Sequence, residues 1–180
     1  MHAPVTMTAL QMGKGTYTQK PMTRTIHEAR VITEAAAKAG VPTQMGNQHH
    51  SGLGYRTVFD VVRSGKIGKV RSAHSWSNRP VWPQGIDRPA GSDPLPAGFD
   101  WDLWLGPAPK RSYNEAYCPF NWRGWWDYGT GALGDMGPHL LDPLVAGLGL
   151  SAPVEVISRC PPPNRWTFPA SSIVRMTFDQ

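Results

Sequence analysis

An aspartate and a histidine lie four residues apart in the glycine-rich stretch 131–144, GALGDMGPHLLDPL. If a helix begins near Asp135, this spacing places Asp135 and His139 on one face, with Pro138 in the first turn, where its missing N–H costs little. A histidine that a carboxylate orients can take a proton from an alcohol as a hydride leaves its carbon. The alternative roles are structural: Asp135 as an N-cap, and His139 as a half-buried, hydrogen-bonded imidazole. The surrounding glycines suit a close approach of the backbone to a ligand.

A second candidate is Lys20, which precedes a proline at the end of the β-rich run 15–21, GTYTQKP. The stiff backbone before Pro21 would hold this lysine, and its ammonium could donate to a hydroxyl group. By itself a surface lysine is the more ordinary interpretation. His49 and His50 follow Asn47 closely, and they could line the same pocket or simply begin the next helix.

The elements that must position these residues alternate at the start of the chain. The first 48 residues predict a helix, a strand, a helix and a strand, at 5–14, 15–21, 26–40 and 41–47. Thr23 or Thr25 would cap the second helix, whose apolar stripe is Ile26, Ala29, Ile32 and Ala36. Strands separated by helices favour parallel pairing, which brings the carboxyl ends of the strands to one edge. Lys20 and Asn47 fall at such ends.

The remainder of the chain predicts a helix at 55–65, a strand at 71–78, a helix near Leu140, and antiparallel strands at 154–158 and 172–178. Between them, the irregular stretch 79–126 carries most of the eight tryptophans. We interpret this stretch as a functional loop whose aromatic rings stack on sugar rings or flat ligands. The alternative is that the tryptophans simply hold together a loop that lacks regular structure.

Composition excludes several classes of protein. With 180 residues, 40% of them apolar and 17% charged, the chain suits one globular domain or two partial ones. No apolar run is long enough to cross a membrane, and the scattered lysines and arginines do not favour nucleic-acid binding. Cys118 and Cys160 lack zinc-site spacing, so we expect ordinary buried or half-buried thiols. Asp142 could extend Asp135 and His139 into a metal set, but no further ligand cluster supports one, so we predict no metal.

The chain resembles the Gfo/Idh/MocA family of nicotinamide-dependent sugar and polyol oxidoreductases along essentially its whole length. Three stretches carry the resemblance in order, HAPVTMTALQMGKGTYTQKP, GVPTQMGNQ and GDMGPHLLDP. Three others resemble a glycan-associated branch of that family, WSNRPVWPQG, FDWDLWLGPAP and WRGWWDYGTGALGDMG.

The resemblance implies an α/β protein, α+β overall, with two parts. Residues 1–48 would be the C-terminal part of a Rossmann NAD(P)-binding domain, a remnant of its parallel βαβ fold. Residues 49–180 would be the C-terminal substrate and oligomerisation domain, incomplete, with a mostly antiparallel open sheet. We therefore expect a homo-oligomer through the open sheet.

The resemblance also implies roles for individual residues. Lys20 matches the lysine of the family's E-K-P motif, beside the nicotinamide and the reacting hydroxyl, while His139 matches the usual acid/base and Asp135 the residue that orients the substrate. The implied cofactor is NAD or NADP, and the residues expected to contact it are Lys20, Pro21, Asn47 and Gln48. The expected substrate contacts are Arg79, Trp82, Gln84, Arg123 and Trp125.

Two departures from the family pattern matter. Gln19 stands where the family has a glutamate, which removes any electrostatic help to Lys20. The chain also has no GxGxxG turn, which would lie before His2 and bind the cofactor phosphates. We therefore interpret the sequence as a central fragment of a longer enzyme, or a truncated gene product, with weakened dinucleotide affinity. The residues that choose between NAD and NADP, and any export signal that separates a cytoplasmic from a periplasmic protein, would lie upstream.

Three functions follow. The favoured one is an NAD(P)-dependent oxidoreductase that moves a hydride to or from a hydroxyl of a sugar or related polyhydroxy compound, with Lys20 polarising that group and His139 moving the proton. The second is NAD-dependent cleavage of a glycoside through a transient keto-sugar. The third is a non-catalytic carbohydrate-binding or oligomerisation module, suggested by the missing cofactor turn and the aromatic loop. The sequence does not name the sugar or the position oxidised.

Overall fold

The computed structural model describes residues 1–179, which divide into two packing units. The first unit consists of Met1–Trp76 and Gly137–Ser151. The second consists of Ser77–Met136 and the segment that follows Ser151. The domain boundary expected at residue 48 stays a prediction.

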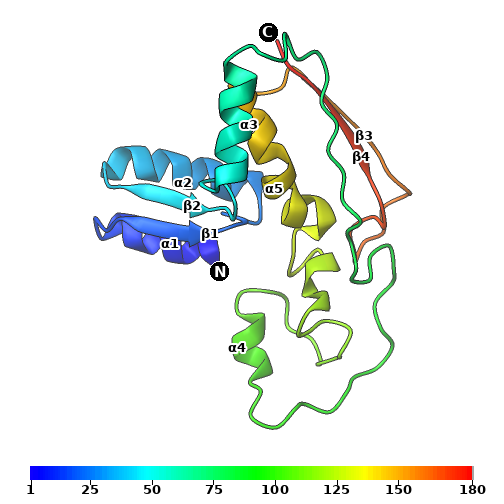
Figure 1. Cartoon of the computed structure of the whole chain (residues 1–180). Helices are drawn as coiled ribbons and strands as arrows, with labels where there is room; N and C mark the ends of the chain where they lie inside the picture. The colour runs from blue at the N-terminus through cyan, green and yellow to red at the C-terminus, as the bar shows by residue number, and fades with distance from the viewer. Residues whose placement is uncertain (180) are drawn as a thin grey trace. The chain divides into compact units, whose positions relative to one another are not determined.

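The first unit begins with the predicted helix, strand, helix and strand (Figure 1). These are α1 (His2–Gln11), β1 (Thr16–Gln19), α2 (Ile26–Ala39) and β2 (Thr43–Gly46). The two strands pair in parallel, from Thr16 opposite Thr43 to Gln19 opposite Gly46. Because parallel strands end at the same edge, the residues after Gln19 and Gly46 become neighbours.

Helix α2 is stabilised at both ends by residues of its own sequence. Thr25 accepts a hydrogen bond from the Glu28 backbone N–H, and the Glu28 carboxylate accepts one from the Thr25 N–H, which together form a capping box. The helix ends at Gly40, whose φ of 63° is the left-handed conformation of a C-cap. Its apolar stripe is shorter than expected, because Ile26 is 78% exposed while Ile32 packs against Ala3 and Leu10 of α1.

Two helices complete the first unit. Helix α3 (Leu53–Arg63) contacts the C-terminal part of α5 (Gly131–Leu148), as the hydrogen bond from the Arg63 Nη2 to the Ala146 carbonyl oxygen shows (2.6 Å; Figure 1).

The strand expected at 71–78 is wrong. The segment pairs with no other strand among residues 1–179, and a β-strand requires such a hydrogen-bonded partner.

The second unit folds around aromatic side chains from the irregular stretch. It contains α4 (Trp101–Leu105), the 3₁₀ helix η1 (Asn121–Gly124), and the strands β3 (Glu155–Arg159) and β4 (Ile173–Thr177). The buried core members are Trp101, Leu105, Tyr113, Tyr117, Cys118 and Trp125. Three of the six tryptophans between 79 and 126, Trp101, Trp104 and Trp125, therefore pack in this aromatic cluster, which supports the structural alternative for these three.

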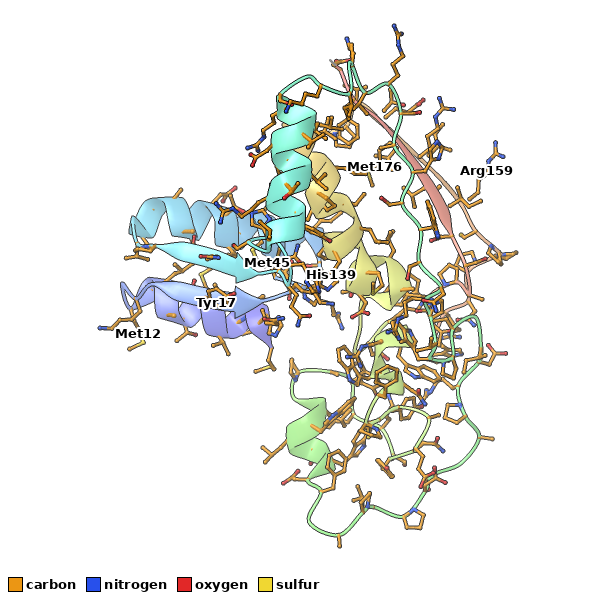
Figure 2. The ribbon with its side chains drawn as sticks, in the orientation of Figure 1. Met12, Tyr17, Met45, His139, Arg159 and Met176 are labelled. Carbon is orange, nitrogen blue, oxygen red and sulfur yellow. The ribbon has the colours of Figure 1, made fainter. Side chains whose placement is uncertain are left out.

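The predicted antiparallel strands are confirmed as β3 and β4, with Val156 opposite Met176. Figure 2 shows Met176 on this pair and Arg159 at the end of β3. Side chains of Ile157 and Ile173 are exposed on the pair. Association of two copies through this sheet stays a prediction.

Helix α5 corrects two sequence expectations. It begins at Gly131, so Asp135 and Pro138 lie inside the helix rather than at its N-cap and first turn. The glycines make room for the chain itself: a Cβ on Gly131, whose φ is 63°, would lie 2.5 Å from the Phe168 ring, and one on Gly134 would collide with Thr130. Glycine is therefore required at these two positions by contacts within the chain rather than by the approach of a ligand.

The two cysteines differ in their surroundings. Cys118 is buried as expected, whereas Cys160 is exposed, which corrects the expectation of a half-buried thiol. Within residues 1–179, no helix combines the length and apolarity that a membrane span requires.

Candidate active site

Lys20 continues the parallel pairing one residue beyond β1. Its backbone N–H donates to the Gly46 carbonyl oxygen (3.0 Å), which fixes the main chain where β1 ends. The following peptide bond, Lys20–Pro21, is cis, and the Pro21 carbonyl oxygen lies 2.7 Å from the Nδ1 of His2. The half-buried lysine therefore leaves the sheet at its carboxyl edge, as the sequence predicted.

Asn47 leaves the same edge from β2 and reaches α5. Its Nδ2 donates to the Pro138 carbonyl oxygen over 2.9 Å. The amide oxygen, Oδ1, is buried and has no hydrogen-bond partner within the described part of the chain. A buried acceptor without a donor is unfavourable, so this atom suits a donor supplied by a ligand.

His139 follows Pro138 on α5 and lies beside the carboxyl edge of the β1–β2 pair (Figure 2). The Tyr55 hydroxyl of α3 donates to the His139 carbonyl oxygen over 3.1 Å. The sheet edge and α3 thus both hold this turn of α5, through Asn47 and Tyr55. Tyr55 was missed by sequence reasoning, because a tyrosine on an amphipathic helix gives no sign of a partner 84 residues away.

His50 and Asp142 form an ion-pair geometry that the sequence did not reveal. The His50 Nδ1 lies 2.8 Å from both carboxylate oxygens of Asp142. The Asp142 side chain is 17% exposed and that of His50 is 49% exposed. Across residues 1–179, no three His, Cys, Asp or Glu side chains come together as metal ligands.

Asp135 is held within the second unit. Its Oδ1 lies 3.6 Å from the Nε of Arg123, whose guanidinium also lies 4.5 Å from the Trp122 ring centroid. Asp135 and His139 both belong to the sequence of α5, and their joint role in a site stays a prediction. The carboxylate oxygens of Asp135 are hydrogen-bond acceptors, which suits contact with substrate hydroxyls.

Three of the expected substrate contacts are packing residues in this structure. Trp82 is 3% exposed and its Nε1 donates to Gln84, which also binds the Ala132 N–H and the Pro169 carbonyl oxygen. Trp125 is 1% exposed. Their contact with a substrate stays a prediction, and it requires this packing to open. Arg79 is exposed, 5.8 Å from the Trp82 ring centroid.

Comparison with known proteins identifies the family. Residues 68–179 match the model of the C-terminal alpha/beta domain of an oxidoreductase family, Gfo/Idh/MocA, which is more than half of the chain. The chain belongs to the Gfo/Idh/MocA oxidoreductase family. The resemblance to this family is thereby confirmed, and the similarity to solved oxidoreductase structures supports the mixed α/β fold.

Individual proteins are similar to the chain over parts of their length. The 1,5-anhydro-D-fructose reductase of Ensifer adhaerens is 32% identical over 75 residues, which are 41% of this chain and 22% of that protein. An oxidoreductase domain protein from Kribbella flavida superposes with a TM-score of 0.63 and 25% identity, over 98% of this chain and 42% of its own.

A NAD binding oxidoreductase from Klebsiella pneumoniae shares the fold, with a TM-score of 0.58 and 22% identity over 99% of this chain and 42% of its own. This Gfo/Idh/MocA chain therefore spans less than half the length of each of the three proteins that it matches.

Proposed function

We propose that this protein is an NAD(P)-dependent oxidoreductase that transfers a hydride to or from a hydroxyl-bearing carbon of a sugar or related polyhydroxy compound. The observation that carries the proposal is the hydrogen bond from Asn47 to Pro138. It joins the carboxyl edge of a parallel strand pair to the turn of α5 that bears His139. Lys20 leaves the same edge, so three groups suited to this chemistry belong to one packing unit.

The strand edge fits the nicotinamide end of such a cofactor. Ligands of parallel α/β sheets bind beyond the carboxyl ends of the strands, where Lys20, Pro21, Asn47 and Gln48 lie. The buried Asn47 Oδ1 needs a donor, and a carboxamide N–H is one. When bound, the nicotinamide would accept or supply the hydride. NAD and NADP share this end, so the proposal covers both.

Side chains of the protein would transfer the hydroxyl proton and stabilise the charge on the reacting oxygen. His139 would accept the hydroxyl proton during oxidation and return it during reduction, since a neutral imidazole accepts at one ring nitrogen. The Lys20 ammonium would donate a hydrogen bond to the same oxygen and stabilise the negative charge that develops on it. Asp135 would accept hydrogen bonds from neighbouring hydroxyls and so orient the ring.

The substrate class rests on the Ensifer adhaerens relative, whose name specifies a reduced anhydro-sugar. A reductase reaction on a sugar is of the type that Lys20 and His139 are suited to assist. We therefore choose 1,5-anhydro-D-fructose as the first substrate to examine, followed by hexoses and cyclic polyols.

The test measures nicotinamide absorbance with these substrates in the full-length protein. Lys20→Ala and His139→Ala should each lower kcat by about 10²-fold to 10⁴-fold, the usual effect of losing a group that acts in the transition state. Lys14→Ala and His27→Ala are matched controls, because both side chains are exposed and lie outside the site. Turnover unchanged in both site variants would contradict the assignment, as would the absence of nicotinamide chemistry with every substrate.

A further inference from the structure

A cavity lies in the first unit, and neither Lys20 nor His139 is among its lining residues. It has a volume of about 360 Å³ and is lined by His50, Ser51, Arg56, Phe59, Arg63 and Ala146. The lining comes from the segment between β2 and α3, from α3 itself and from the last part of α5. The proposed hydride transfer uses none of these residues.

The cavity is basic because two arginines face it from one helix. Arg56 and Arg63 are seven residues apart on α3, which is about two turns, so they lie on the same side of the helix. Arg63 is fixed by its bond to the Ala146 carbonyl oxygen and lies 5.6 Å from the Phe59 ring centroid. Arg56 is exposed and makes no ion pair within the described chain.

No carboxylate lines the cavity to balance this charge. The nearby Asp142 binds the Nδ1 of His50, which leaves the Nε2 as the ring nitrogen for a ligand. The other acid on α3, Asp60, is exposed and is not part of the lining. The polar side therefore presents two guanidinium groups, an imidazole and the Ser51 hydroxyl.

We propose that this cavity binds the phosphate group of a small organic phosphate monoester. Arginine pairs bind phosphate oxygens with charge-assisted hydrogen bonds, and two guanidinium groups with the Ser51 hydroxyl suit three phosphoryl oxygens better than the two oxygens of a carboxylate. Phe59 is buried and, with Ala146, forms an apolar side for the carbon skeleton. The cavity is open to solvent, and its volume of about 360 Å³ leaves room for a small organic phosphate.

The experiment is calorimetric titration of the full-length protein, without nicotinamide cofactor, at low ionic strength. The probes are inorganic phosphate, glycerol 3-phosphate, glycerol and acetate. Arg56→Gln should raise the Kd for both phosphates at least about tenfold, the effect of losing a charge-assisted pair. Arg30→Gln is the matched control, because it removes the same charge from an exposed position on α2.

The proposal is supported if Arg56→Gln weakens phosphate binding while Arg30→Gln changes the Kd by less than about twofold. An effect of net charge alone would weaken binding similarly in both variants. Equal weakening in both variants would show a response to net charge and overturn the proposal. Acetate binding as tight as that of phosphate would overturn the phosphate assignment, and no binding of either phosphate would remove the site. Hydride transfer is measured separately, so failure here leaves the proposed function standing.

Discussion

The Asn47 side chain donates to the Pro138 carbonyl oxygen over 2.9 Å, and this bond joins the end of β2 to α5 across 91 residues of sequence. Asn47→Ala removes the donor, so we expect the free energy of unfolding to fall by about 1 kcal/mol. Urea denaturation measures the change. Gln48→Ala, at the exposed neighbouring position, should change stability by less than about 0.5 kcal/mol, and an equal loss in both variants would contradict the role of this bond.

The capping box predicts a pH dependence of stability. Burial raises the pKa of Glu28, but hydrogen bonds from the Thr25 and Arg24 backbone, the Thr25 hydroxyl and the Arg24 charge outweigh it, so the pKa lies below its ordinary 4.5. Because the pKa of Glu28 is lower in the folded protein than in the unfolded chain, the ionised carboxylate contributes its full stabilisation above pH 4.5. This contribution is lost as the pH falls through the folded-state pKa.

Glu28→Gln should therefore lose less stability than the native protein between about pH 5 and pH 3, measured by thermal unfolding across that range. Glu34→Gln is the matched control, since Glu34 is exposed in the middle of the same helix, away from its N-terminal N–H groups. Identical pH profiles of the native protein and Glu28→Gln would show that the carboxylate contributes nothing as a cap.

Substitution of Trp125 tests whether this residue serves in packing or in substrate contact. It is 1% exposed, and its Nε1 donates to the Ala116 carbonyl oxygen over 3.0 Å. Trp125→Ala should lower the free energy of unfolding by about 3–5 kcal/mol, as truncations of buried aromatic residues do. Trp76→Ala, at a residue that is 82% exposed, should change it by less than about 0.5 kcal/mol. A raised KM with unchanged stability in Trp125→Ala would instead favour substrate contact.

Two helical glycines should respond to alanine with opposite signs. Gly131 has a φ of 63° and no room for a Cβ beside Phe168, so Gly131→Ala should destabilise the protein by more than about 1 kcal/mol. At Gly54 in α3, nothing lies within 4 Å of the position of a Cβ, so Gly54→Ala should raise stability by about 0.5 kcal/mol. Chemical denaturation measures both, and a stabilised Gly131→Ala would contradict the close approach of Phe168.

Local sequence patterns correctly predicted the elements that are stabilised by residues close to them in the sequence. The Thr25 cap and the Gly40 stop of α2 are set by residues within one or two turns, and the structure confirms both, whereas Ile26 of the predicted apolar stripe is exposed. The strand at 71–78 was wrong because β-rich composition does not supply a ladder partner. The start of α5 was misplaced because its glycines and prolines are poor helix formers in isolation, and contacts within the folded chain override that preference.

The sequence by itself determined the family, the parallel arrangement of the first strands, and the placement of Lys20 and Asn47 at one sheet edge. Only the tertiary structure decided that Asn47 binds Pro138 and that His50 binds Asp142, at separations of 91 and 92 residues. The physical reason is that a side chain's type fixes which bonds it can make, whereas the partner depends on which distant segments the packed helices and strands bring within 3 Å.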